Sequence, residues 1–307
     1  MLEVATIDYH TAGEPFRIVV DGTPPLPGAT VAERRAAAFA SEEAETVRRL
    51  LCHEPRGHAD MYGCFLVPPD DEGADLGVLF WHKDGYSTAC GHGTIALGAW
   101  AVESGRVAGP EVTIDVPSGR VVAVVGADGA VTFRNVPSYV IARSVPAAGV
   151  SVDVSYGGAI YASVPAGALG LTVRPEHVND LIAAGRAVKA ALPETDLYGT
   201  IIYEELGDAE DGPRQRNVTI FADGEVDRSP CGSGTSARMA LLAADGRLDG
   251  GRVLTHESII GTSFRARVTG RDGDEVLTEV EGAAFRTGEH RFTLDPRDPV
   301  RTGFVLR

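Results

Sequence analysis

One short phrase, Cys-Gly-x-Gly-Thr, occurs twice in this chain. The first copy begins at Cys90 and the second at Cys231, an offset of 141 residues, and each opens a helix-like segment. Glycine lets the backbone turn tightly, and a helix N-terminus offers unpaired N–H groups at its positive end. A cysteine just before such a helix has its thiolate favoured, so its pKa can fall from about 8.5 towards neutrality. The phrase therefore predicts a reactive thiol beside a carboxylate site.

The offset extends beyond the two phrases. Downstream residues that match in register are Ala96 with Ala237, Ala99 with Ala240, Gly105 with Gly246 and Arg106 with Arg247. Upstream, a predicted helix from Thr30 to about Leu51, opened by a capping box with Glu33, corresponds to a helix-like stretch from Pro175 to Leu192. We predict a duplicated half-molecule with one thiol per half, the two thiols facing one site across a pseudo-two-fold axis. Such a pair suits moving a proton off one face of a carbon and onto the other.

Other interpretations of the cysteines stay open. Each could be a buried structural thiol. Cys90, His92 and Cys231 could bind zinc, although no Cys-x-x-Cys or His-Glu-x-x-His spacing supports a metal site. A cysteine hydrolase would need an oriented base, and His92 is too close in the sequence to Cys90 to be recognised as one. The paired-thiol interpretation is favoured because a packing position has little need to recur inside the same glycine frame.

The composition is that of an ordinary globular chain. Its 307 residues are 44% hydrophobic and 23% charged, and they suffice for two domains. The net charge of −15 disfavours nucleic acid and anionic membranes as partners. We expect a cytoplasmic protein with four free cysteines, because no signal peptide and no apolar run of about 20 residues is present.

Strand-like runs fill much of the remaining chain. They are 6–20, which ends at a turn, 112–125 with a turn at 117–119, 218–221 and 276–280. The acidic stretch 207–213 reads as an exposed loop, and 145–149 is the best boundary between the halves. We predict the α+β class with two similar domains, residues 1–146 and 147–295, and a cleft between them.

At these residues the chain resembles the proline racemase superfamily, which includes hydroxyproline 2-epimerases and trans-3-hydroxy-L-proline dehydratases. The most specific segments are 85–92 and 227–235, and further matching segments are 10–15, 54–58, 61–63 and 156–158. The resemblance implies a diaminopimelate-epimerase-like fold of two pseudo-symmetric domains, each a curved sheet around a central helix, with the active site in the cleft between them. It also implies that residues from about 296 to 307 return to the first domain, that no cofactor or metal is used, and that the protein is a homodimer.

The resemblance further implies roles for single residues. Cys90 and Cys231 would be the two acid/base thiols. The groups that would bind the substrate carboxylate, largely through backbone N–H, are Gly91, His92, Gly232 and Ser233. Asp227 would bind the substrate amine, and Phe221 would line an apolar wall against the pyrrolidine ring. Asp227 could instead cap its loop, and Phe221 could simply belong to the core.

The resemblance points to two reactions. Segments 81–88 and 295–306 look most like the 3-hydroxyproline dehydratase branch, yet those dehydratases commonly have Thr where this chain has Cys231. Ala89 stands where many members have Met, which leaves the pocket shape open. We therefore expect a cofactor-independent racemase or epimerase of proline or hydroxyproline. The alternatives are a trans-3-hydroxy-L-proline dehydratase that uses the same site and a non-catalytic thiol redox sensor.

Overall fold

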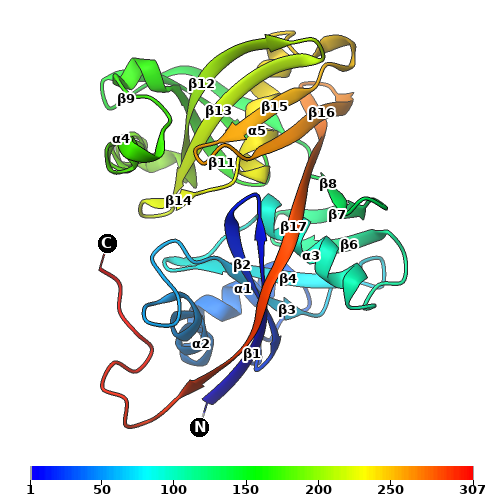
Figure 1. Ribbon diagram of the computed structural model, residues 1–307, viewed down its shortest axis with the longest axis vertical. Coiled ribbons are helices and arrows are strands. Elements are labelled where there is room, and N and C mark those ends of the chain that lie inside the picture. The colour runs from blue at the N-terminus through cyan, green and yellow to red at the C-terminus, as the bar shows by residue number, and fades with distance from the viewer. Residues whose placement is uncertain (1, 307) are drawn as a thin grey trace. The chain divides into compact units, whose positions relative to one another are not determined.

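The computed structural model describes residues 2–306, which form two compact units (Figure 1). Of these residues, 2–11, 15–131 and 283–306 belong to the first unit, and 12–14 and 132–282 belong to the second. The chain from residue 283 onward is therefore part of the first unit. Residues 1 and 307, at the limits of the predicted domains, lie outside the described residues. No helix within residues 2–306 combines the length and the apolar character that crossing a membrane requires.

The first unit mixes parallel and antiparallel strand pairs. Its elements are β1 (Leu2–Thr11), β2 (Glu14–Asp21), α1 (Val31–Ala40), α2 (Glu42–Cys52), β3 (Gly63–Val67), β4 (Leu76–His82), β5 (Gly85–Tyr86), α3 (Gly91–Glu103), β6 (Glu111–Val116) and β7 (Gly119–Val125). Strand β2 pairs parallel with β3, β3 antiparallel with β4, β4 parallel with β6, and β6 antiparallel with β7. The short β5 pairs antiparallel with the end of β4, directly before α3.

The second unit repeats this pairing. Its elements are β9 (Tyr139–Ala147), β10 (Val150–Tyr156), β11 (Ile160–Pro165), α4 (Val178–Ala190), β12 (Gly199–Ala209), β13 (Gly212–Phe221), β14 (Glu225–Asp227), α5 (Gly232–Ala244), β15 (Leu254–Ser258) and β16 (Ser263–Asp272). Strand β11 pairs parallel with β12, β12 antiparallel with β13, β13 parallel with β15, and β15 antiparallel with β16. β14 pairs antiparallel with β13, directly before α5. Two further strands, β8 (Ala130–Arg134) and β17 (Glu275–Leu294), contribute residues to both units, as β2 does through Glu14.

Each unit is built around a helix buried on nearly every side. In the first unit α3 is buried from Gly91 to Ala101, and it packs against β1, β6 and β7. In the second unit α5 is buried from Gly232 to Ala243 and packs against β9, β10, β11 and β16. The sequence explains this for α3, which carries no charged residue before Glu103, because a helix that is apolar all round must be buried. Both Cys-Gly-x-Gly-Thr phrases therefore open a central helix, as predicted.

The predicted helix from Thr30 to about Leu51 is wrong in one respect, because the structure has two helices there. Thr30 is the predicted N-cap, and its Oγ1 accepts a hydrogen bond from the Glu33 N–H at 3.2 Å. Ser41 then ends α1, while its Oγ accepts from the Ala44 N–H at 3.1 Å and so begins α2. Ser is a strong N-cap, and here it starts a new helix in the middle of an otherwise helical sequence.

The strand predictions were confirmed except at two places. The run 6–20 is two strands, because Ala12 and Gly13 have φ values of 51° and 96° and turn the chain between β1 and β2. The predicted loop 207–213 is a tight hairpin, in which β12 runs to Ala209 and β13 starts at Gly212. Asp208, within β12, pairs with Arg252 at 2.5 Å, and Asp211, in the turn, pairs with Arg265 of β16 at 2.6 Å. That support is tertiary and has no local signal.

Candidate active site

The first cysteine loop holds its sulfur against the start of a helix. Cys90 is the N-cap of α3, and its Sγ accepts a hydrogen bond from the Gly93 N–H at 3.2 Å. The thiol is buried, with 6% of the residue exposed. Gly91 and His92 form the first turn of the helix beside it. The loop therefore has the predicted geometry of a thiol at the positive end of a buried helix.

The imidazole of His92 lies next to the Cys90 sulfur. Its Nδ1 is 3.4 Å from Sγ, and its ring meets the rings of Phe16 and Tyr62 edge to face at 5.7 and 5.0 Å between centroids. Thr11 Oγ1 donates to the His92 carbonyl at 2.9 Å. The helix start therefore brings the two side chains together, although the short spacing in the sequence did not allow His92 to be recognised as a base for Cys90.

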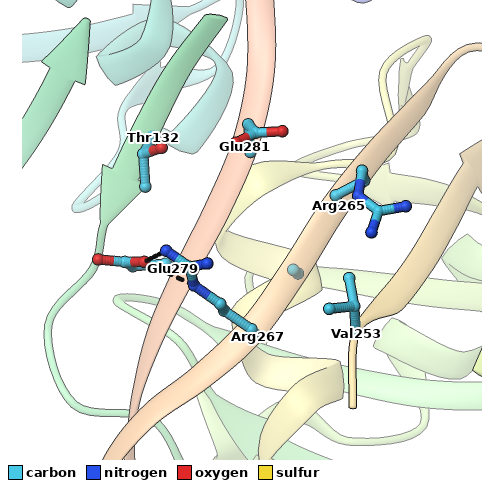
Figure 2. A pocket seen from close by; sticks show the side chains of 7 residues that line it. Thr132, Val253, Arg265, Arg267, Glu279 and Glu281 are labelled. Atoms are coloured by element: carbon cyan, nitrogen blue, oxygen red, sulfur yellow. Dashed lines mark hydrogen bonds and ion pairs between the residues drawn. The ribbon is translucent and has the colours of Figure 1, made fainter. Parts of the chain in front are cut away.

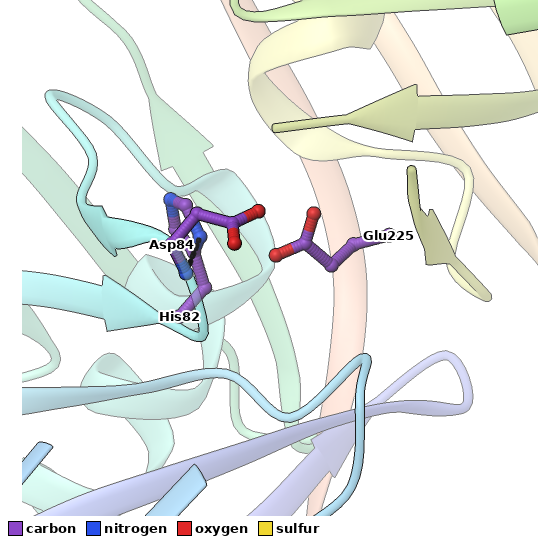
Figure 3. Close-up of side chains that lie close together, drawn as sticks. All are labelled: His82, Asp84 and Glu225. Carbon is purple, nitrogen blue, oxygen red and sulfur yellow. Dashed lines mark hydrogen bonds between the residues drawn. The ribbon is translucent and has the colours of Figure 1, made fainter. Parts of the chain in front are cut away.

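The turn between β4 and β5, shortly before Cys90, is fixed from within the first unit. The Asp84 N–H donates to Nδ1 of His82 at 3.2 Å, as Figure 3 shows. Buried Arg48 donates to the His82 carbonyl at 2.5 Å. Glu225, drawn in the same figure, belongs to β14 of the second unit, where its carboxylate accepts from the Asp223 N–H at 3.0 Å.

The second cysteine loop has a different backbone. Cys231 is the N-cap of α5 with φ +65°, whereas Cys90 is extended with φ −155°. A residue with a β-carbon rarely has a positive φ, and holding it there costs about 1–3 kcal/mol. The second loop therefore stores strain that the first loop does not.

Asp227 is linked to Cys231 through Ser229. The Asp227 Oδ1 accepts from the Ser229 N–H at 2.8 Å and from the Ser229 hydroxyl at 2.7 Å. Ser229 Oγ in turn accepts from the Cys231 N–H at 3.1 Å. Burial raises the pKa of Asp227 to about 6, although the hydrogen bonds from Ser229 and Cys231 oppose the rise. A buried carboxyl group with a pKa so close to neutrality suits a residue that ionises to meet a cationic ligand.

Burial also decides the protonation state of Cys231. It raises the pKa of the Cys231 thiol well above its ordinary value, and the nearby Asp227 carboxylate adds to the rise. Hydrogen bonds from the Gly234 N–H and the Thr219 hydroxyl oppose it. A helix N-terminus stabilises an anion by at most about 2 kcal/mol, whereas full burial disfavours a charge by about 4 kcal/mol or more. The expected fall of this pKa towards neutrality is therefore wrong for Cys231 in the substrate-free protein.

An aromatic run leads from Cys231 to Phe221. Cys231 packs in a buried cluster with Tyr161 and Ile201. Tyr161 meets Tyr198 edge to face at 5.8 Å, and Tyr198 stacks on Phe221 at 5.7 Å between centroids. The two tyrosines were not predicted as site residues, because nothing in the sequence marks them and they come from other parts of the fold. Tyr198 lies next to Phe221, which was expected from the sequence alone to line an apolar wall.

The first turn of α5 contains a buried hydroxyl with no partner. Ser233 follows Gly232 and is 1% exposed, and its Oγ has no hydrogen-bond partner within residues 2–306. Leaving a buried hydroxyl unpaired costs about 1–3 kcal/mol. This atom, together with first-turn N–H groups, which have no acceptor within the helix itself, can receive an anionic ligand. Six of the predicted site residues thus lie at the two helix starts, three at each, while Asp227 and Phe221 lie on β14 and β13.

Apart from the cysteine loops, the second unit has a small hollow of about 80 Å³ (Figure 2). It is lined by Thr132, Val253, Arg265, Ala266, Arg267, Glu279 and Glu281. Arg267 pairs with Glu279 at 2.6 Å, and Arg265 pairs with Asp211 at 2.6 Å. Both guanidinium groups therefore already have carboxylate partners. Within residues 2–306, neither unit by itself gathers three metal-ligating side chains at coordination distance.

Comparison with known proteins identifies the family. The family model described as "Proline racemase" matches residues 6–305, nearly the whole chain. The chain belongs to the proline racemase family. It is accordingly an enzyme of this family, as its resemblance had implied.

Relatives in the proline racemase family bear two kinds of name. A protein of Burkholderia cenocepacia named trans-3-hydroxy-L-proline dehydratase is 45% identical, with 99% of this chain and 98% of the relative covered. A protein of Burkholderia multivorans named 3-hydroxyproline 2-epimerase is also 45% identical over the same shares. The names of these relatives therefore leave the choice between isomerase and lyase open.

Solved structures place the fold among proline racemases. A hydroxyproline epimerase from Agrobacterium vitis, with bound trans-4-hydroxy-L-proline, has a TM-score of 0.87 and 30% identity over 99% of this chain and 96% of that chain. A PhzF-family phenazine biosynthesis protein from Bacillus anthracis, 13% identical over 96% of this chain and 100% of that chain, has a TM-score of 0.62 and shares the fold alone. The expected fold is confirmed at this level, while the pseudo-symmetry of the domains and the cleft stay predictions.

The role of the second glycine of each Cys-Gly-x-Gly-Thr phrase in positioning the cysteine sulfur can be tested directly. A Cβ added at Gly93 would lie 2.8 Å from Cys90 Sγ and 2.4 Å from Phe16, and one at Gly234 would lie 2.9 Å from Cys231 Sγ. We expect Gly93→Ala to lower the free energy of unfolding by about 1–3 kcal/mol and both variants to displace their thiols. Urea unfolding and iodoacetamide labelling of each cysteine measure this. Gly167→Ala, whose Cβ would meet nothing within 4 Å, is the matched control. Unchanged labelling in both variants would show that the close approach does not position the sulfurs.

Proposed function

We propose that this enzyme inverts the α-carbon of a hydroxyproline by a two-cysteine acid/base mechanism. The observation that carries the proposal is that both buried central helices begin at a cysteine, Cys90 and Cys231, in the same glycine frame. Thiols suit proton transfer because protein surroundings can tune their pKa. The relative named 3-hydroxyproline 2-epimerase and the hydroxyproline epimerase with bound trans-4-hydroxy-L-proline support the substrate class.

The proposed reaction begins with removal of the α-hydrogen. Burial keeps the proton on Cys231 by raising its pKa, so in the proposal Cys231 is the donor in the resting enzyme and Cys90 is given the role of base. Cys90 takes the proton from one face of the α-carbon, and Cys231 returns one to the other face. The proposal requires the two cysteine loops to face one bound ring, and the roles exchange for the opposite stereoisomer.

The carbanion must be stabilised for this transfer to occur. In the proposal the substrate carboxylate binds the first-turn N–H groups of both helices, from Gly91, His92, Gly232 and Ser233. These fixed dipoles favour the charge that develops on the carboxylate as the α-hydrogen leaves. Asp227 ionises to bind the substrate ammonium, and the aromatic run from Tyr161 to Phe221 excludes water from the ring. The chemistry uses protein groups alone, and we expect a homodimer.

Dehydration of trans-3-hydroxy-L-proline is the second candidate, because a relative equal in identity is named for that reaction. One thiolate would remove the α-hydrogen, and the bond from C3 to its hydroxyl would break with a proton delivered to the leaving oxygen. Water and an enamine would form, and the enamine would tautomerise to a cyclic imine. Cys231 argues against this candidate, because such dehydratases commonly have Thr there.

A substrate panel in deuterium oxide tests the proposal. Proline, 3-hydroxyproline and 4-hydroxyproline would be incubated with enzyme and analysed by chiral chromatography and mass spectrometry. We expect at least one hydroxyproline to give its 2-epimer with deuterium at the α-carbon. An imine that a coupled imine reductase consumes, with no epimer, would favour dehydration instead. No α-exchange with any of these compounds would contradict both.

A further inference from the structure

The two helix-capping cysteines are held by different means. The Cys90 loop needs no special support, because its backbone is extended and Thr94 Oγ1 donates to the Cys90 carbonyl within the same helix at 2.8 Å. Cys231, in contrast, has φ +65°. A strained backbone persists only where its surroundings over-determine it, so the contacts around Cys231 must supply that restraint.

The peptide before Cys231 is fixed at its carbonyl oxygen. Pro230 O accepts a hydrogen bond from Asn217 Nδ2 at 3.1 Å and another from Thr235 Oγ1 at 3.2 Å. Asn217 lies on β13, and its Nδ2 also donates to the carbonyl of Glu257 on β15 at 3.3 Å. The peptide is therefore tied to two strands of the sheet and to the helix that it opens.

Buried His256 completes this arrangement. It lies on β15, and its Nδ1 is 2.8 Å from Thr235 Oγ1. Burial and the neighbouring Arg238 guanidinium lower the pKa of His256 to about 3, so the imidazole is neutral and carries one proton. The single hydroxyl hydrogen of Thr235 is donated to Pro230 O, so the imidazole proton must be on Nδ1 and be donated to Thr235. Nε2 then has no hydrogen-bond partner within residues 2–306.

We propose that His256 is a positioning residue for Cys231. Its Nδ1–H orients the Thr235 hydroxyl towards Pro230 O, and the fixed peptide holds the left-handed backbone that buries the thiol beside Asp227 and Tyr161. The residue 141 positions before His256, in the first unit, is Asp115. Its carboxylate pairs with Arg120 at 2.8 Å and does not position Cys90 in this way. The expected effect of His256 on turnover rests on the proposed function. The expected effect of His256 on the labelling of Cys231 does not.

A matched pair of variants tests this role. Asn places an amide where Nδ1 of His256 lies, whereas Leu fills the buried space without a donor. We expect His256→Leu to relax the backbone and raise the iodoacetamide labelling rate of Cys231 by about fivefold or more, with Cys90 changed by less than about twofold. We expect kcat for the hydroxyproline to fall by about 10- to 100-fold while KM stays within about threefold. His256→Asn should restore both to near the wild-type values.

Labelling of each cysteine, read by peptide mass spectrometry on the full-length protein, needs no substrate. A labelling change at Cys231 alone upholds the proposal even if no hydroxyproline is turned over, in which case only the proposed function fails. Equal changes at both cysteines, or none, overturn it, as does a His256→Asn variant that behaves like His256→Leu. If His256→Leu does not fold, Thr235→Val removes the same link with little change in volume, and the same outcomes apply.

Discussion

Replacing Cys231 with serine will strongly slow inversion of the α-carbon while proton exchange at one face of that carbon continues. A serine hydroxyl is far less acidic than a thiol, so it cannot return the proton at a useful rate. General acid–base catalysis contributes about 10²- to 10⁴-fold to rates, and we expect the epimerase kcat to fall within that range. Cys90, as thiolate, would still remove the α-hydrogen of one stereoisomer and return deuterium to the same face. Serine is chosen over threonine because a β-branched residue tolerates the φ of +65° poorly.

The matched variant for this experiment is Cys90→Ser. Epimerisation and dehydration both begin with removal of the α-hydrogen. Cys231→Ser should still exchange the α-hydrogen of one stereoisomer, and Cys90→Ser should lose the exchange of that same stereoisomer. Chiral chromatography and mass spectrometry in deuterium oxide separate exchange from inversion. If Cys231→Ser kept epimerase activity within tenfold of wild type, the two-cysteine mechanism would be falsified. If it lost epimer but kept imine formation, the dehydratase would be favoured.

Replacing Asp227 with asparagine will stabilise the protein at pH 8 and nearly abolish its activity. The pKa of Asp227 is raised from 3.8 to about 6 by burial, so its ionised form is disfavoured in the folded state. The stability that the neutral carboxyl contributes is fully present below pH 3.8 and is lost as pH rises through about 6. At pH 8 the ionised group therefore costs up to about 3 kcal/mol. Asparagine mimics the neutral form, and its Oδ1 can still accept both hydrogen bonds from Ser229.

The test is urea unfolding of Asp227→Asn and wild type at pH 8 and pH 4. We expect the variant to be more stable by about 2–3 kcal/mol at pH 8 and about equal in stability at pH 4. Activity should fall by about 100-fold or more, because the variant has no charge to bind the substrate ammonium. Asp223→Asn, which removes an exposed carboxylate paired with Arg186, controls for the loss of a charge. A stability difference that is the same at both pH values would contradict the assigned shift.

Local sequence signals predicted local structure well. The Thr30 cap, the turn at 117–119 and the start of a helix at each Cys-Gly-x-Gly-Thr phrase all occur in the structure. Such features depend on neighbouring residues, so the sequence contains what decides them. Ser41 shows the limit, because its hydroxyl ends one helix and begins another, and a periodic helical pattern continues across it. Exposed residues 207–209 were predicted as loop but are strand, since pairing across the hairpin is not a local property.

The sequence by itself determined the family, the two thiols and the helix starts that hold them. These features could be recognised because each cysteine and its glycines lie in one short stretch of sequence, and that stretch recurs at a constant offset. Only the tertiary structure decided the left-handed backbone of Cys231, the imidazole beside Cys90 and the support from His256. It also decided the direction of the Cys231 pKa, because the residues that pack around this thiol, Tyr161 and Ile201 among them, come from strands far away in the chain. A helix start favours a thiolate wherever it occurs, but burial by distant strands outweighs it.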